Sequence, residues 1–152
     1  MAHRTRIANM PERIVAGAFI LSTGLDKLRA DDEHAAGVHG MAKGTYPFLA
    51  DVPPPQFTKA LAVGEVALGS ALLLPVVSDR TAGLGLAAFA GGLLGLYART
   101  PGLRREGSVR PSQQGTAIAK DVWLLGIGLG LVADSFRRHD RRRDRRVADG
   151  GA

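Results

Sequence analysis

The stretch TAGLGLAAFAGGLLGLYA, at residues 81–98, contains no charged residue. At about 18 residues it is just long enough to cross the hydrocarbon core of a bilayer, ~30 Å thick, as a helix. The run is continuously apolar rather than alternating, so it predicts a helix and not a strand of a membrane barrel. Because backbone groups in lipid must be hydrogen-bonded within the chain, such a run indicates a membrane-spanning helix.

A second apolar stretch, residues 60–77, precedes the first and contains a single charged residue, Glu65. Only Ser78, Asp79 and Arg80 separate the two stretches. So short a polar link predicts an antiparallel helical hairpin. These two stretches are the clearest candidate spans of the chain.

Two shorter apolar runs, residues 14–25 and 122–133, lie nearer the ends of the chain. Runs of about 12 residues also suit a buried helix of a soluble protein or a signal peptide. Asp26 and Lys27 follow the first run where a cleaved signal would have small residues, so we expect no cleavage. Both runs can be extended past the charged residues at their ends, because long charged side chains there can reach the membrane surface. We therefore predict an all-α integral membrane four-helix bundle of up-down-up-down order.

The predicted organisation has three parts. Residues 1–12 are expected to form a basic cytoplasmic tail, residues 13–136 the membrane domain, and residues 137–152 an Arg-rich tail. The four spans are placed, in chain order, at residues 13–29, 57–78, 81–98 and 117–136.

The composition agrees with this division. Mean hydropathy is only +0.03, but charge is kept out of the apolar stretches, and many of the 20 glycines lie inside them. Glycine weakens soluble helices, whereas in membranes it lets helices approach closely. Gly91-x-x-x-Gly95 and Gly126-x-x-x-Gly130 offer close-packing faces of this kind, although a Gly-rich chain also produces the spacing by chance.

The formal net charge of +6 is concentrated in the C-terminal tail. Because the tail directly follows a span, anchoring of the cytoplasmic side and attraction to anionic lipid explain it better than nucleic-acid binding. We predict a multi-pass protein of the cytoplasmic (inner) membrane with both termini in the cytoplasm. The residues expected to contact lipid or a partner are Arg137, Arg138, Arg141, Arg142, Arg143, Arg145 and Arg146.

The polar residues near the helices gather at one end of the predicted bundle. Glu65 lies eight residues past Phe57, roughly 12 Å deeper along a helix. A charge at that depth costs a few kcal/mol and usually faces a partner inside the bundle. Lys120 is the first-choice partner and Lys27 the second. The candidate cluster, serving either as a proton or ligand site or as a link between helices, is Asp26, Lys27, Glu65, Lys120 and Asp121.

Metal and thiol chemistry are not expected. The chain has no cysteine, which excludes disulfides, thiol catalysis and Cys-ligated clusters. The four histidines all lie outside the expected spans, so a haem held between membrane helices is not expected. His34 and His39, in the long loop predicted at residues 30–56, fit no standard metal site, and a solvated loop is the simpler interpretation.

Short motifs occur in a characteristic order along the chain. STGLDKL at residues 22–28 ends the first span, and a Pro-rich loop follows. GEVALG at residues 64–69 opens the second span, and AKDVWLL at residues 119–125 opens the fourth. In this order the chain resembles the DoxX family of small four-helix membrane proteins over residues 13–134.

This resemblance implies association with oxidative-stress or sulfur-redox systems. Some family members are membrane subunits of thiosulfate:quinone oxidoreductase, and others are thought to recruit soluble redox enzymes. We therefore expect a membrane scaffold or non-catalytic subunit, with soluble redox enzymes, other membrane subunits or further copies of itself as partners. The alternatives are a quinone-linked oxidoreductase subunit, for which quinone is the candidate cofactor, and a small-solute transporter. No catalytic residue can be assigned, and the motifs overlap the polar cluster at Lys27, Glu65, Lys120 and Asp121.

Overall fold

The computed structural model describes residues 7–149 and, within them, the side chains of residues 7–137. All regular structure in this part of the chain is helical, which confirms the predicted all-α class. The long helices are α1 (Met10–Leu28), α3 (Pro54–Leu73), α4 (Asp79–Arg99) and α6 (Val122–Asp149). The short ones are η1 (Ile7–Asn9), α2 (Asp32–Thr45), η2 (Pro47–Leu49) and α5 (Thr116–Ala119).

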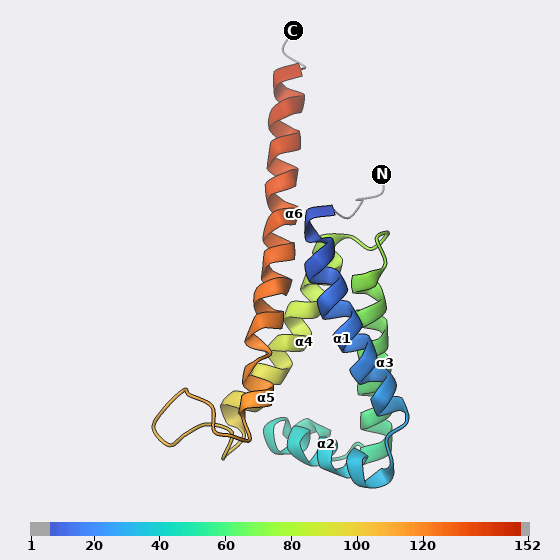
Figure 1. The fold of residues 1–152 in the computed structure, drawn as a ribbon, viewed down its shortest axis with the longest axis vertical. Coiled ribbons are helices and arrows are strands. Elements are labelled where there is room, and N and C mark those ends of the chain that lie inside the picture. Colours follow the sequence, from blue (N-terminus) through green and yellow to red (C-terminus); the bar gives the residue numbers. More distant parts are fainter. Residues whose placement is uncertain (1–6, 150–152) are drawn as a thin grey trace.

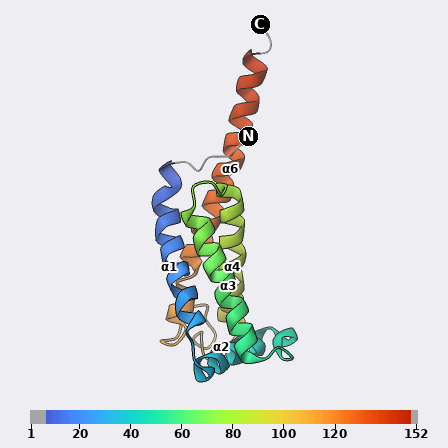
Figure 2. The same ribbon diagram turned by 90° about the vertical axis from the view of Figure 1, so that its right-hand side faces the viewer.

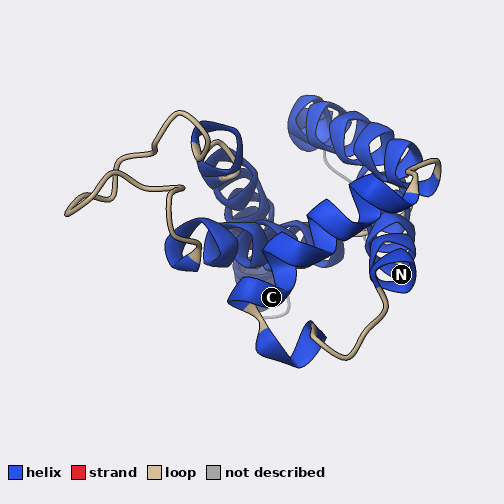
Figure 3. Ribbon diagram, turned by 90° about the horizontal axis from the view of Figure 1, so that it is seen from below, coloured by secondary structure: helices blue, strands red, loops and turns tan. Residues whose placement is uncertain are grey.

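The long helices alternate in direction and form two pairs (Figures 1 and 2). Helix α1 packs against α3, and α4 packs against α6. The pairs lie close together near the start of α1 and spread apart towards α2, which lies across the wide end (Figure 1). Viewed from that end, the loop at residues 100–115 reaches away from the helices (Figure 3).

The predicted α3–α4 hairpin is present as a connection, but it is not the main packing unit. The expected second span ends earlier than residue 78, because Pro75 disfavours a helical conformation at Leu74, where α3 stops. Ser78 then caps α4 by accepting a hydrogen bond from the backbone N–H of Thr81 at 3.1 Å. Each of the two helices packs chiefly on a partner farther away in the sequence.

Glycines bring the partners of each pair together, but not the glycines of the predicted motifs. A Cβ atom on Gly69 would lie 2.6 Å from the backbone nitrogen of Leu21, and one on Gly83 would lie 2.7 Å from the carbonyl oxygen of Gly128. Gly91, Gly126 and Gly130 have open space around them instead, and Gly95 faces the Tyr46 hydroxyl rather than a helix. Of the two interpretations of these Gly-x-x-x-Gly spacings, the structure favours chance, because these glycines do not meet a partner helix.

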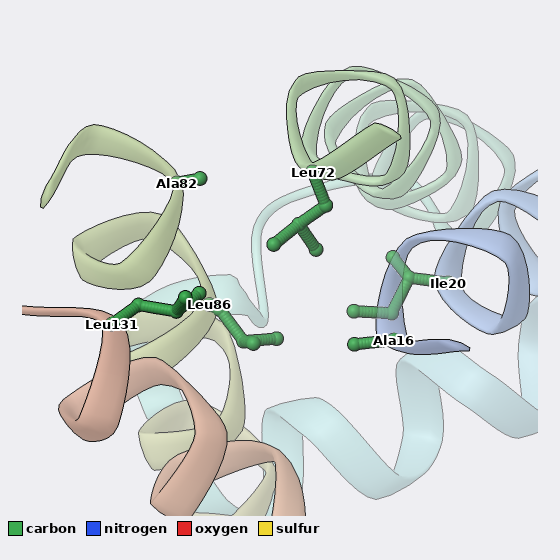
Figure 4. Packing of buried hydrophobic residues seen from close by; sticks show 6 residues of the cluster. All are labelled: Ala16, Ile20, Leu72, Ala82, Leu86 and Leu131. Carbon is green, nitrogen blue, oxygen red and sulfur yellow. The ribbon is translucent and has the colours of Figure 1, made fainter. Parts of the chain in front are cut away.

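The buried apolar cluster is small and lies where the two pairs meet. Figure 4 shows Leu86 of α4 pointing towards Ala16 and Ile20 of α1. The six members are Ala16, Ile20, Leu72, Ala82, Leu86 and Leu131.

The region predicted as a long solvated loop contains α2 and η2. Asp31 begins α2 by accepting a hydrogen bond from the backbone N–H of His34 at 2.8 Å. His39 is buried rather than solvated, its Nε2 lies 2.9 Å from the carbonyl oxygen of Leu49, and its ring meets Phe57 edge-on. The prediction failed here because the Ala and Gly residues of α2 give almost no apolar periodicity.

Among the described residues, two helical segments are long and apolar enough to cross a membrane: Asp79–Arg99 and Thr116–Arg137. Within the apolar 18-residue window of each segment, only 28% of the first and 11% of the second is buried. The stretch at 81–98 and the C-terminal apolar segment thus have the length and hydropathy expected of a membrane span. The stretch at 60–77 does not. Charged residues at both ends of α1, and Lys59 and Glu65 within α3, account for their lower hydropathy.

Candidate functional site

A cavity of about 1040 Å³ lies between the two helix pairs. Helices α1 and α3 form one wall, α4, α5 and the start of α6 form the other, and α2 with η2 lies across the wide end. The lining is mainly apolar, and Ile20, Leu61, Phe89 and Leu93 contribute to it. The cavity exists because each pair is held together internally while the pairs meet only at the opposite end.

An ion pair stands on the α1–α3 wall. Lys27 Nζ lies 2.9 Å from Glu65 Oε2, and Thr23 Oγ1 donates a hydrogen bond to the same carboxylate oxygen at 3.3 Å. The Glu65 side chain is 4% exposed and that of Lys27 is 19% exposed. Both residues line the cavity, so the amine is partly open to whatever fills it.

Lys120, the first-choice partner of Glu65, does not fill that role. It is exposed and does not line the cavity, and the second choice, Lys27, is confirmed. The reason is helix pairing: α6 packs on α4, so the residues before it lie across the cavity from α3.

The other members of the predicted cluster are separated in space. Asp121, between α5 and α6, is half-buried and lines the cavity on the wall opposite Glu65. Asp26 is exposed and lies in a shallow depression outside the cavity. The cavity therefore unites Lys27, Glu65 and Asp121, and it leaves out Asp26 and Lys120.

Several lining residues could not be identified from the sequence. Tyr46 donates a hydrogen bond from its hydroxyl to the carbonyl oxygen of Gly92 at 2.9 Å, which ties the end of α2 to α4. Phe89, Gly92 and Leu93 belong to a stretch that is apolar on all sides, so no periodicity marks the face that meets the cavity.

A second polar cluster, at the narrow end, was missed altogether. Arg13 is completely buried, and its Nη1 lies 2.8 Å from Asp79 Oδ1. The guanidinium also donates hydrogen bonds to four carbonyl oxygens at the end of α3 and in the link that follows it, those of Ala71, Leu72, Leu74 and Val77. The last carbonyls of a helix lack partners within it, so Arg13 supplies the donors they need.

Asn9 extends this cluster to the fourth long helix. Its side-chain amide donates to Asp79 at 3.0 Å and to Asp134 of α6 at 3.1 Å. Nearby, the guanidinium carbon of Arg80 lies 4.9 Å from the centre of the Phe136 ring. The cluster of Asn9, Arg13, Asp79 and Asp134, called the clamp below, joins both helix pairs through hydrogen bonds within the protein. One sequence signal for it exists, because Arg13 and Asp79 each border an apolar run.

The structure also places the remaining predicted features. Within the described part of the chain, no group of three or more His, Asp or Glu residues is arranged to hold a metal ion. Helix α6 continues through the Arg-rich tail and projects beyond the other helices (Figure 1). Arg137 is exposed on it, and the side chains of the other tail arginines lie outside those described.

No protein-family model matches the chain, and neither a curated protein nor a solved structure matches it.

Proposed function

We propose that this chain is a four-span protein of the cytoplasmic membrane that binds a small amphipathic molecule in its cavity, as the membrane subunit of a redox or oxidative-stress system. One observation carries the proposal. A mainly apolar cavity of about 1040 Å³ presents the Lys27–Glu65 pair on its wall. Ligand sites typically have this character, with few polar groups on apolar walls and volumes of ~300–1,000 Å³.

The distribution of exposed side chains supports the membrane location. Val15 is 69% exposed on α1, Val63 54% on α3, Leu84 52% on α4 and Leu129 54% on α6. A soluble protein rarely exposes large apolar patches, so large exposed apolar side chains on all four long helices favour a membrane location. At the same time Arg13 of α1 and Glu65 of α3 are buried and point inward to partners, as charges in membrane helices usually do.

The head group of the ligand can be inferred from the ion pair. Lys27 has ammonium protons to donate, and the Glu65 carboxylate can accept a hydrogen bond. A molecule with an oxygen or nitrogen head group and an apolar body satisfies both this pair and the cavity walls. A quinone can accept a hydrogen bond from Lys27, and its reduced quinol form can also donate one to Glu65. The redox association implied by the resemblance to DoxX proteins makes these the first compounds to seek.

The test uses two neighbouring glycines of α4. A Cβ atom added at either Gly91 or Gly92 would meet nothing outside its own helical turn within 4 Å, but only Gly92 lines the cavity. Gly92→Leu therefore fills the site, and Gly91→Leu is the matched control. We expect solvent extraction of the full chain, purified from its own membranes, to yield one amphipathic compound near 1:1, lost only in Gly92→Leu. Equal extracts from both variants would overturn the proposal.

A scaffold role is the second candidate, and the projecting part of α6 favours it. This segment carries the arginines of the tail beyond the packed helices, where a partner or a lipid surface can reach it. We expect soluble redox enzymes to co-purify with the full chain and to be lost when it is truncated after Arg137. Purification of the full chain alone from native membranes would reject this role.

A further inference from the structure

The charges of the cavity carry an inference about its occupant, which rests on the proposed function. We infer that the cavity selects its ligands by charge and accepts a hydrophobic organic cation in preference to an anion of the same size. The cavity itself defines the site, and the charged groups on its walls determine which sign of ligand charge it favours.

The lining residues are predominantly acidic. Four carboxylates line the cavity, those of Asp31, Glu33, Glu65 and Asp121, against the single ammonium of Lys27. Lys27 lies 2.9 Å from Glu65 and balances its charge, and no second Lys or Arg is found among the described residues that line the cavity. The imidazole of His34 also lines the cavity, whereas Lys43, Lys59, Arg99 and Lys120, at the same end of the molecule, do not.

The carboxylates also differ in how exposed they are to solvent. Asp31 and Glu33, at the start of α2, are exposed, whereas Asp121 is half-buried on the far wall. A cleft lined by charges of one sign, with walls of low dielectric, concentrates ions of the opposite sign. The arrangement therefore attracts a cation at the mouth and offers it an anionic partner inside.

The remaining lining residues select the kind of cation. Phe19, Tyr46, Phe57 and Phe89 contribute aromatic rings to the cavity. Ring faces attract cations, and they do so most strongly where the cation is poorly hydrated. The apolar walls favour a bulky organic group over a hydrated inorganic ion, which would lose its water without gaining a set of oxygen ligands. An organic anion of the same size would meet three carboxylates.

Two ions of matched size test the sign of the charge directly. Tetraphenylphosphonium and tetraphenylborate have nearly the same shape and opposite charges. Each is titrated into the full chain in phosphatidylcholine nanodiscs by equilibrium dialysis. Cavity binding is the difference between Gly91→Leu and Gly92→Leu, because both variants share any partitioning into lipid. We expect the phosphonium to bind in the cavity at least about tenfold more tightly than the borate.

A second pair of variants tests the source of the selectivity. Asp121→Asn removes a carboxylate that lines the cavity, and Asp26→Asn removes an exposed one outside it. We expect Asp121→Asn to weaken phosphonium binding several-fold and Asp26→Asn to leave it unchanged. Equal effects of the two variants would overturn the role of the lining carboxylates.

The outcomes separate this inference from the proposed function. Borate binding as tight as phosphonium binding overturns the inference and leaves a cavity that binds amphipathic molecules. The same holds if neither ion binds in the cavity but a neutral compound is extracted from the Gly91→Leu protein and not from Gly92→Leu. If neither ion binds and no compound depends on Gly92, both proposals fail.

Discussion

The two buried ion pairs described above, Arg13–Asp79 and Lys27–Glu65, differ in the groups that surround them. At the narrow end, Arg13 and Asp79 have side chains that are 0% and 3% exposed. All of the hydrogen bonds given above for Arg13 end on oxygen atoms of α3, α4 and the link between them. At the wide end, the Lys27 side chain is 19% exposed and lines the cavity.

This difference separates a structural pair from a candidate binding pair. The clamp donates hydrogen bonds to carbonyl groups at a helix end, which lack partners within the helix. Its charged groups are therefore already hydrogen-bonded within the protein. The Lys27–Glu65 pair joins only α1 and α3, which already pack closely through Gly17 and Gly69. Its charges are therefore available to a ligand in a way that those of the clamp are not.

The largest expected effect follows from removing Arg13. In Arg13→Met, Asp79 loses the hydrogen-bonded guanidinium of Arg13 and four carbonyl oxygens lose a donor, so we expect the free energy of unfolding to fall by about 3–5 kcal/mol. Denaturing-detergent titration of the purified protein measures this. Arg13→Lys serves as the control and should recover part of the loss, because an ammonium donates fewer hydrogen bonds than a guanidinium. A loss below about 1 kcal/mol in Arg13→Met would remove the distinction between the pairs.

The next effect tests whether glycine contacts, rather than the Lys27–Glu65 pair, hold α1 on α3. A Cβ at Gly69 would lie 2.6 Å from a backbone atom of α1, so we expect Gly69→Ala to lose about 1–3 kcal/mol. Gly64→Ala, on the same helix with open space around it, should be neutral or slightly stabilising. The same unfolding titration compares them, and equal stabilities would contradict this packing.

Removing the charge of Glu65 should lower the free energy of unfolding less than Arg13→Met does, but it should weaken ligand binding strongly. In Glu65→Gln, the partly exposed Lys27 keeps access to the cavity, so we expect a loss of roughly 1–2 kcal/mol. The amount of compound extracted from the purified protein should fall at least tenfold. Thr23→Val, which removes the neighbouring hydroxyl, provides a milder comparison. A variant as unstable as Arg13→Met with its ligand retained would reverse the assignment of the two pairs.

The smallest effect concerns the link from the clamp to α6. Asn9 donates to both Asp79 and Asp134, so Asn9→Ala should lower the free energy of unfolding by about 0.5–1.5 kcal/mol. Hydrogen exchange of α6 residues near Asp134 should rise, while exchange in α3 stays unchanged. Unaltered exchange in α6 would show that the contact between the helix pairs does not depend on Asn9.

The sequence predicted the features that depend on local composition. Continuous apolar runs led to the all-α class, and an isolated acid inside one of them led to Glu65 and its second-choice partner Lys27. The helix pairing could not be predicted, because closeness along the chain favours α3 with α4, whereas Gly17, Gly69, Gly83 and Gly128 select other partners.

The missed parts depend on contacts between distant segments. Arg13 and Asp79 border apolar runs, where such charges usually mark the edge of a membrane span, and only the meeting of α1 with the end of α3 makes them a buried pair. The cavity depends on this same arrangement. Helix α2, which lies across its wide end, was hidden by a composition rich in Ala and Gly.

The central claim, that the Lys27–Glu65 pair serves a ligand and not the fold, is tested most directly by exchanging the two charges. The double variant Lys27→Glu, Glu65→Lys keeps one ion pair between α1 and α3, but it places the negative charge on α1 and the positive charge on α3. Native mass spectrometry of this protein and the wild type, released from their own membranes, reports bound ligand. We predict near wild-type stability with the ligand mass lost. Retention of the ligand in the exchanged protein would contradict the claim.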